Sequence, residues 1–380
     1  MRISLNWLND YIDIKSYSVQ QIAEILTHLG FEVENIEEFC SVSGDIVVGR
    51  ILKSEKHPNA DTLWYCLVDV GDNEPLEIVC GAPNADSGKT VCVAKVGSVA
   101  ANGLKIKKTK IRGIMSNGMI CAEDELGIGT DHTKIIELSD NLAIGSSVID
   151  LFQLKDVVLD INVPPNRPDL LGVIGVAREI SAKLSVPLKY PNSDDIKYDS
   201  TIKTKDMVQV HIESTDDCPR YVALYIEDVN PQLKSPIWMQ KRLEACGIRP
   251  INLIVDITNY VMLEYSQPIH AFDYELINNK EIYVKRALGG EHFITLDSKE
   301  RVLSATDLLI CDKQCPIALA GVIGGANSEI NANTKAIVIE VAVFNFSMIR
   351  KTSKNHSIRT EASYRFERGT DIKNLLTVTK

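Results

Sequence analysis

The sequence lacks both a long hydrophobic run and a regular cysteine pattern. Nowhere in its 380 residues do 18 apolar residues follow one another, so it predicts no membrane-spanning helix. The first segment, residues 1–14, has one arginine and an interrupted apolar pattern, so we expect no signal peptide. The nine cysteines are scattered from Cys40 to Cys315, which argues against a disulfide scaffold. Together these absences predict a soluble protein with reduced thiols in the cytoplasm.

Familiar catalytic and cofactor patterns are missing too. No Ser-His-Asp or Cys-His arrangement can be identified by spacing. The glycines at 321, 324 and 325 follow an apolar run, but no Lys-Ser/Thr pair follows them as a P-loop requires. Cys311 and Cys315 have no histidine or second cysteine pair nearby, so a hairpin with two buried thiols is favoured over a zinc site.

The chain also lacks an excess of positive charge. The formal net charge of −10 argues against a protein that coats nucleic acid without specificity, so local basic patches must bind any anionic partner. One patch is the stretch 349–368, with six basic and two acidic residues. The other has no intervening acid and consists of Lys105, Lys107, Lys108, Lys110 and Arg112. On a strand, Lys108 and Lys110 would share one face, either to bind phosphates or to protect an exposed strand edge.

The length and the composition, 45% hydrophobic and 24% charged, predict two or three globular domains. Residues 1–39 resemble a small α/β unit, because Ser18 and Gln21 form a capping box before a helix that Gly30 closes. Helical periodicity returns between Leu171 and Leu184. We therefore expect residues 148–190 to complete the small unit begun by residues 1–39.

The intervening residues 40–147 are rich in short β-type runs separated by Pro, Gly, Asn and Asp clusters. Five strands at this spacing predict a small closed barrel, with the oligonucleotide-binding (OB) fold as the leading candidate. The five expected strands are Ile46–Leu52, Leu63–Val70, Leu76–Val79, Thr90–Val96 and Leu104–Ile111.

A mixed α+β domain is predicted over residues 200–380, after a polar linker from Pro191 to Lys205. Ser235 as N-cap, Pro236 in the first turn and Gly247 past the end bracket one helix, and a second pattern runs from Leu253 to Val261. The expected strands are Ile282–Arg286, Leu308–Cys311, Ile317–Ala320 and Ala336–Val341. The fold class is thus α+β and multidomain, with the barrel inserted in a small α/β unit.

Two residues of this domain could carry chemistry. His270 follows the second helix in an expected turn, where a histidine commonly has a structural hydrogen-bonding role. Glu340 lies between two apolar runs, where a buried carboxylate is costly unless a partner satisfies it. Glu340 either points outward or pairs with an arginine, or it is a recognition group at the bottom of a pocket.

Several segments together resemble one family, the bacterial phenylalanyl-tRNA synthetase beta subunits. Three of them are similar to a barrel-type tRNA-binding module: Val48 through Asp61, Ile78–Asn84 and Lys110–Met119. The others narrow the resemblance to this family: Leu5–Leu8, Val163–Asp169, Asn252–Asp273, Ala320–Gly325 and Glu361–Gly369.

The resemblance implies a subunit that does not activate phenylalanine. In the family the alpha subunit does so with ATP and magnesium, in an α2β2 assembly, so no cofactor is expected within this chain. The beta subunit binds tRNA(Phe) and hydrolyses mischarged Tyr-tRNA(Phe) at an editing site. Carried over by motif, that site involves Arg249, Pro268, His270, Gly324, Glu340, Thr360 and Ala362.

Family members are longer than this chain, so the modules that dock the alpha subunit are expected to be missing. An editing site is physically reasonable, because a pocket for phenylalanine cannot strongly exclude tyrosine. If Glu340 accepts a hydrogen bond from the tyrosine hydroxyl, phenylalanine leaves that group unpaired. A positioned water, oriented by His270 or by a tRNA hydroxyl, would then hydrolyse the ester. The alternative is a tRNA-binding or scaffolding fragment without hydrolytic activity.

Overall fold

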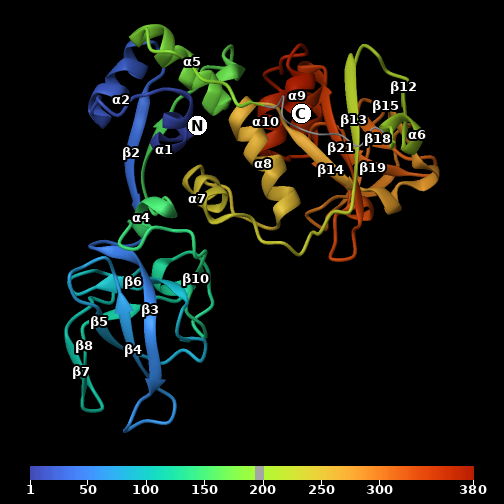
Figure 1. Ribbon diagram of the computed structural model, residues 1–380. Coiled ribbons are helices and arrows are strands. Elements are labelled where there is room, and N and C mark those ends of the chain that lie inside the picture. Colours follow the sequence, from blue (N-terminus) through green and yellow to red (C-terminus); the bar gives the residue numbers. More distant parts are fainter. Residues whose placement is uncertain (193–200) are drawn as a thin grey trace. The chain divides into compact units, whose positions relative to one another are not determined.

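The computed structural model describes residues 1–192 and 201–380 (Figure 1). The expected linker from Pro191 to Lys205 therefore lies partly outside the described residues. The chain divides into two compact units, of which one comprises Met1–Ile36 with Leu159–Lys380 and the other Glu37–Val158. No helix within the described ranges is long and apolar enough to cross a membrane.

The first unit begins with a small layer of helices and strands. The Ser18 hydroxyl accepts from the Gln21 N–H and the Gln21 side chain accepts from the Ser18 N–H, so the predicted capping box is confirmed. Strand β11 lies between β1 and β2 in a three-stranded sheet. The elements are β1 (Arg2–Ser4), α1 (Leu5–Tyr11), α2 (Val19–His28), β2 (Val33–Cys40), β11 (Lys155–Ile161) and α5 (Val173–Leu184).

The second unit contains an antiparallel sheet of order β10-β6-β3-β4-β5, in which β9 also pairs with β6. At the β5 edge, the Asn117 N–H donates to the Glu77 carbonyl over 2.8 Å, and the Val79 N–H donates to Ser116 Oγ over 3.1 Å. These bonds join β5 to the chain around β9, so the sheet is barrel-like and nearly closed. Its members are β3 (Ile46–Lys56), β4 (Trp64–Asp69), β5 (Leu76–Cys80), β6 (Thr90–Lys95), β9 (Gly118–Ile120) and β10 (Glu137–Leu138), with short helices α3 (Glu123–Leu126) and α4 (Val148–Leu151) nearby in sequence.

One predicted strand of this unit is wrong. The run Leu104–Ile111 is not a barrel strand, because only its last three residues form β7 (Thr109–Ile111), which pairs with β8 (Ile114–Ser116) in a separate ribbon. Lys105 makes a single β-bridge to Val99, and buried Ile106 fixes the segment to the core. Lys108 therefore lies before the strand rather than on a strand face beside Lys110.

The rest of the first unit is built on two sheets. One is the antiparallel sheet β13-β21-β14, made of β13 (Arg220–Glu227), β21 (Ala336–Val343) and β14 (Ile269–Asp273). The other has the order β12-β15-β18-β19-β20, in which β12 and β15 are parallel. Its strands are β12 (Gln209–Ile212), β15 (Glu281–Arg286), β18 (Leu308–Cys311), β19 (Pro316–Leu319) and β20 (Ile323–Gly324), and β16 (His292–Ile294) pairs with β17 (Glu300–Val302) in a hairpin.

A shared apolar core holds these two sheets together. Phe272 of β14, Val338 of β21 and Leu309 of β18 belong to one buried cluster. The helices of this part are α6 (Thr204–Met207), α7 (Ile237–Ala245), α8 (Leu253–Tyr265), α9 (Phe346–Asn355), α10 (Glu361–Phe366) and α11 (Leu375–Thr379), and four short 3-10 turns are Pro168–Leu171, Tyr274–Leu276, Asn278–Lys280 and Ala326–Ser328.

Three local expectations are corrected by this part of the fold. The N-cap position of α7 is occupied by Pro236, which makes no capping hydrogen bond, rather than by Ser235, whose hydroxyl instead donates to buried Asp256 over 2.5 Å. His270 lies on strand β14, not in a turn, because the chain after Pro268 pairs with β21. The expected β18–β19 hairpin is present; Cys311 is buried as expected, but Cys315 is only half-buried, and both thiols are free.

Candidate functional site

A cavity of about 490 Å³ lies in the first unit, between helix α8 and the strands that follow it. Six of the seven predicted site residues line it: Pro268, His270, Gly324, Glu340, Thr360 and Ala362. Most of the other lining residues are apolar, and none of those in the described ranges is a lysine or an arginine. These six residues, which come from four separate segments, are thus brought together around one cavity.

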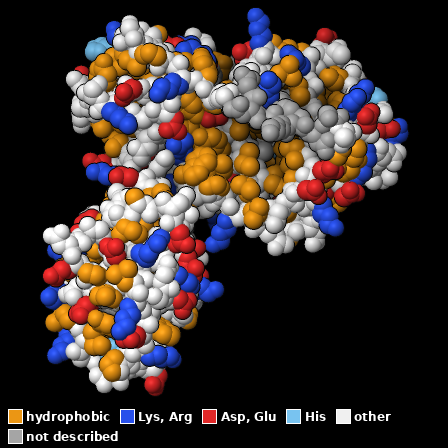
Figure 2. Space-filling view, in the orientation of Figure 1, with side chains coloured by type: hydrophobic (Ala, Val, Ile, Leu, Met, Phe, Trp, Pro, Cys, Tyr) orange, Lys and Arg blue, Asp and Glu red, His pale blue; other side chains and the backbone are white. Residues whose placement is uncertain are grey.

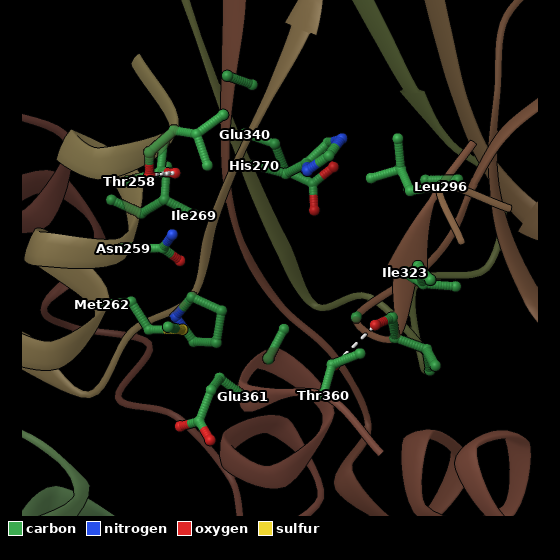
Figure 3. A pocket seen from close by; sticks show the side chains of 18 of the residues that line it. Thr258, Asn259, Met262, Ile269, His270, Leu296, Ile323, Glu340, Thr360 and Glu361 are labelled. Atoms are coloured by element: carbon green, nitrogen blue, oxygen red, sulfur yellow. Dashed lines mark hydrogen bonds between the residues drawn. The ribbon is translucent and has the colours of Figure 1, made fainter. Parts of the chain in front are cut away.

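Strand pairing places His270 beside Glu340. β21 is the central strand of its sheet, and Glu340 on it is directly opposite His270 on β14. Side chains directly opposite each other in an antiparallel pair lie on the same face with Cβ atoms about 5 Å apart. Figure 3 shows the carboxylate and the imidazole side by side on this wall, with Asn259 and Met262 to one side and Leu296 to the other.

Glu340 is the buried acid of the cavity, with only 5% of its surface exposed. Burial raises the pKa of its carboxyl to about 8, and a hydrogen bond from Tyr221 acts in the opposite direction. The Tyr221 hydroxyl donates to Glu340 Oε2 over 3.0 Å. The partner of Glu340 is therefore a tyrosine rather than the arginine considered from the sequence.

His270 is held as a neutral imidazole. Burial lowers its pKa to about 4, so the ring carries no charge at neutral pH. The ring packs edge to face on Phe272 at 4.5 Å, and no side chain within the described ranges hydrogen-bonds its nitrogens. A neutral ring of this kind can accept from or donate to a molecule in the cavity, but its low pKa makes it a weak base.

Gly324 keeps the space that the imidazole occupies. A Cβ at this position would lie 2.7 Å from His270 Cε1 and 2.9 Å from Leu296 Cδ1. Contacts this short do not occur between real side chains, so any larger residue would displace His270 or Leu296. Gly324 therefore acts on the site through its neighbours.

Thr360 and Ala362 lie where helix α10 begins. The Thr360 hydroxyl accepts from the Ser363 N–H over 3.0 Å and donates to the Val322 carbonyl over 2.8 Å (Figure 3). The hydroxyl proton is thus used in fixing the helix to the cavity wall. The backbone N–H groups of Glu361 and Ala362 lie in the first helical turn, where no intrahelical acceptor exists, and both residues line the cavity.

Arg249 is the exception among the seven. It is exposed and does not line the cavity, although Ile251, two residues later, does. Figure 2 shows apolar side chains gathered over α7 and the start of α8, where Trp238, Ile251 and Ile257 are exposed. Arg249 thus adds a cation close to an apolar rim.

Sequence reasoning missed Tyr221, Asn259 and Leu296. Tyr221 lies on β13, which was not expected as a strand although apolar and aromatic residues fill the run Tyr221–Ile226. Leu296 comes from the tip of the β16–β17 hairpin, where its N–H donates to the Gly324 carbonyl over 3.0 Å. No periodic signal could have placed that tip at the cavity.

The five basic residues of the second unit lie around the β7–β8 ribbon. The four lysines at 105, 107, 108 and 110 are exposed, and so is Arg112, which lies at the turn with a φ of 46°. Across the described ranges none of the five forms an ion pair. The ribbon is anchored by His57, whose Nε2 lies 3.3 Å from the Ile111 carbonyl, and by Asn59, whose amide donates to the Arg112 carbonyl over 3.1 Å.

The second basic stretch, 349–368, covers α9 and α10. Arg350, Lys351 and Lys354 are exposed on α9. Arg359 and Arg368 lie over the ring of Tyr364, at 4.7 and 3.7 Å from its centre. Arg365 is buried instead, where it donates to the Leu171 carbonyl and pairs with Glu361, so not every cation of this stretch is available to a partner.

Comparison with protein families gives two matches. The family described as "Putative tRNA binding domain" matches residues 46–147, and the family described as "B3/4 domain" matches residues 217–380. The first match covers the barrel-like sheet, and the second contains every residue of the cavity.

Individual relatives match almost the whole chain. A phenylalanine–tRNA ligase beta subunit from Syntrophus aciditrophicus is 45% identical over 99% of this chain and 46% of its own length. The beta subunits from Desulfotalea psychrophila and Geobacillus kaustophilus are 47% and 44% identical, over 98% of this chain and 45% and 46% of theirs. The chain thus spans about half the length of these relatives. Among solved structures, an N-terminal fragment of the phenylalanyl-tRNA synthetase beta subunit from Pyrococcus horikoshii covers 57% of this chain and 62% of that chain, at 17% identity and a TM-score of 0.29.

Proposed function

Because this chain is homologous over nearly its whole length to phenylalanine–tRNA ligase beta subunits, we propose that it binds tRNA and hydrolyses mischarged Tyr-tRNA(Phe) in the cavity around Glu340. The observation that carries the proposal is the buried carboxylate of Glu340, which lies in an otherwise apolar cavity beside the neutral ring of His270. A buried acceptor in an apolar cavity is suited to an aromatic ring that carries a hydroxyl.

Discrimination follows from the cost of leaving Glu340 without a ligand partner. Tyrosine donates its hydroxyl to the carboxylate, whereas phenylalanine places a C–H edge there. A buried polar group that loses its partner costs about 1–3 kcal/mol, and a charged one costs more. The cavity therefore favours the residue that a synthetic pocket for phenylalanine excludes poorly.

Hydrolysis needs a placed water but no covalent nucleophile, because an aminoacyl ester is already activated. His270 orients the water or the terminal ribose hydroxyl, since its low pKa makes it a poor proton acceptor. The N–H groups of Glu361 and Ala362 are donors for the oxyanion, together with backbone near Gly324. Pro268 and Thr360 shape the wall, and Arg249 binds a phosphate or ribose of the tRNA end at the rim.

The second unit supplies tRNA affinity in this proposal. Residues 40–147 form an OB-fold tRNA-binding domain, inserted between residues 1–39 and 148–190, and residues 200–380 form the editing domain. The exposed and unpaired cations of the ribbon bind backbone phosphates, which is the main source of affinity for a nucleic acid. These cations are Lys105, Lys107, Lys108, Lys110 and Arg112.

The further partners proposed belong to the whole ligase. An alpha subunit would join the beta subunit in an α2β2 cytoplasmic enzyme that uses ATP and Mg²⁺ for aminoacylation. Within the described part of the chain no three His, Cys, Asp or Glu side chains are grouped to hold a metal ion. On the family resemblance we assign the nucleotide and the metal to that partner.

The test is deacylation of Tyr-tRNA(Phe) and of Phe-tRNA(Phe) by the 380-residue chain, with tRNA binding measured in parallel. The proposal expects release of tyrosine well above the spontaneous rate and little release of phenylalanine. Binding without any release would favour the second candidate, a tRNA-binding or scaffolding fragment, for which the basic ribbon alone is sufficient. Absence of both binding and release would contradict both candidates.

A further inference from the structure

Tyr221 contacts the candidate site at one point only. It lies on β13, half-buried, and its ring packs against the apolar core shared by the two sheets. It does not line the cavity. Its hydroxyl donates to Glu340 Oε2 over 3.0 Å, so any effect of Tyr221 on a bound molecule must pass through Glu340.

The strand register explains why this pair forms. Ala223 of β13 is directly opposite Glu340, and Tyr221 is opposite Ala342, two residues further along β21. Residues two apart on a strand point to the same face, and diagonal neighbours are within reach of long side chains. A row of side chains therefore crosses three strands in the order Tyr221, Glu340, His270.

The two carboxylate oxygens of Glu340 consequently differ. Oε2 is held by Tyr221, whereas no group within the described ranges hydrogen-bonds Oε1. Some side-chain atoms of the described residues are both fully enclosed and without a hydrogen-bond partner, but Oε1 is not one of them. This is expected for an oxygen at the surface of the cavity. Figure 3 shows the carboxylate directed into the cavity beside the His270 ring.

We propose that Tyr221 is a positioning residue for hydroxyl recognition: it holds one oxygen of Glu340 and thereby presents the other to the phenol of a tyrosyl ligand. The inference rests on the proposed function, since it names how that site distinguishes tyrosine from phenylalanine. In this arrangement the Tyr221 hydroxyl donates a hydrogen bond to one oxygen of Glu340, and the hydroxyl of the tyrosyl ligand donates to the other.

Electrostatics gives this contact a measurable consequence. Burial raises the pKa of Glu340 to about 8, and the Tyr221 hydrogen bond lowers it, because that bond favours the ionised form. The other titratable groups facing Glu340 do not supply a cation: His270 is neutral, and burial raises the pKa of the Cys218 thiol to about 12. The remaining titratable groups of the wall are the exposed acids Glu329 and Glu361.

The ionised carboxylate is the better acceptor for a phenol, so discrimination should increase as the pH rises through the titration of Glu340. Without the Tyr221 hydroxyl, Glu340 ionises at higher pH and its carboxylate is less firmly oriented. The loss of Tyr221 should thus reduce discrimination most strongly near neutral pH.

The experiment measures the affinities of the 380-residue chain for L-tyrosinamide and L-phenylalaninamide between pH 6 and 9. These probes share the amine and are not esters, so their affinity ratio isolates the hydroxyl. In Tyr221→Phe we expect the ratio to fall about tenfold near pH 7, the effect of one hydrogen bond to a charged group, and its pH midpoint to move upward.

Tyr225→Phe is the matched control. Tyr225 lies on the same strand and its hydroxyl donates to Glu227 over 3.2 Å, outside the cavity. This variant should leave both the ratio and its midpoint unchanged. A double-mutant cycle with Glu340→Gln should be non-additive, because Tyr221 acts through Glu340.

The outcomes separate the inference from the function on which it rests. A wild-type chain that binds both amides equally at every pH would contradict the proposed hydroxyl recognition itself. A wild-type preference for tyrosinamide that Tyr221→Phe retains, with the same midpoint, would overturn the role of Tyr221 alone. Equal effects of Tyr221→Phe and Tyr225→Phe would show a general loss of packing and would also overturn it.

Discussion

The two units use charge in opposite ways. In the second unit the cations around the β7–β8 ribbon are exposed and have no ionic partner among the described residues. In the first unit the central ionisable group, Glu340, is buried among apolar side chains and opposite a neutral histidine. Exposed cations act through the long-range attraction of phosphates, whereas one buried carboxylate acts through a single short contact. Affinity and selectivity are thus expected to respond to different substitutions.

His270→Ala is expected to have the largest effect on chemistry. Hydrolysis of Tyr-tRNA should fall about 10²-fold or more, because a group that orients the water or ribose is lost. The salt dependence of tRNA binding should not change, since the ring is neutral. Single-turnover deacylation and a binding titration check this. Full activity in the variant would remove His270 from the mechanism, and a changed salt slope would break the separation between the two units.

Glu340→Ala should act on selectivity. The variant removes the partner of the tyrosine hydroxyl and also the group that disfavours phenylalanine. Hydrolysis of Tyr-tRNA should therefore fall while hydrolysis of Phe-tRNA stays level or rises, so that the ratio of the two kcat/KM values falls about tenfold or more. Both substrates and the melting curve are measured on the one variant. A parallel loss of both rates with a lower Tm would instead indicate a structural role.

The local elements of both units could be predicted because their signals are local. The capping box at Ser18, the helix around Leu253–Tyr265 and the strand Ala336–Val343 all follow from neighbouring residues. The same reasoning was wrong for Leu104–Ile111, because alternating lysine and isoleucine also fits an irregular segment anchored by buried Ile106.

The cavity could not be predicted by periodicity, because its contacts join distant parts of the chain. His270 was expected in a turn, and its strand exists only through pairing with β21, 70 residues later. Tyr221 and Glu340 are 119 residues apart. The resemblance to a family identified the site residues that line the cavity, but Tyr221 was not among them. The pairing register of β13 with β21 is what brings Tyr221 into contact with Glu340.

Stability should also reveal the buried acid. Burial raises the pKa of Glu340 from 4.5 to about 8, so between those pH values the native state holds a proton that the unfolded state has lost. Stability therefore decreases as the pH rises through this window, by up to about 1.4 kcal/mol per pH unit for one group. The lowered pKa of His270 acts oppositely, but only between about 4 and 6.5.

The range from pH 7 to pH 8 separates Glu340 from buried Glu264, because the raised pKa of Glu264, about 7, has its effect mainly below that range. Glu340→Gln should flatten the pH dependence of the free energy of unfolding there, by up to about 1.4 kcal/mol across the interval. Urea titrations at several pH values measure this. Glu227→Gln, which alters a tyrosine-bonded acid outside the cavity, should leave the slope as it is. An unchanged slope in Glu340→Gln would mean that Glu340 is ionised in the native state well below pH 7.

The smallest effect is expected at the ribbon, and it is the one that most sharply tests the contrast between the units. Replacing both Lys108 and Lys110 by Ala should flatten the log–log salt dependence of tRNA binding by slightly less than one unit for each lost phosphate contact. Affinity falls only at low salt, and the ratio of Tyr-tRNA to Phe-tRNA hydrolysis at saturation stays the same, because neither lysine lies in the unit that holds the cavity.

The matched control replaces Lys53 and Lys89, whose ammonium groups already pair with Glu55 and with Asp86 and Glu137. This control removes the same charge as the ribbon double variant. Each of its lysines must give up an acidic partner before it can bind a phosphate, so each contributes less free energy to tRNA binding. Equal slopes in both double variants would show that net charge, and not the ribbon, determines binding. An unchanged slope after Lys108 and Lys110 are replaced would leave these lysines as protection for an exposed strand edge.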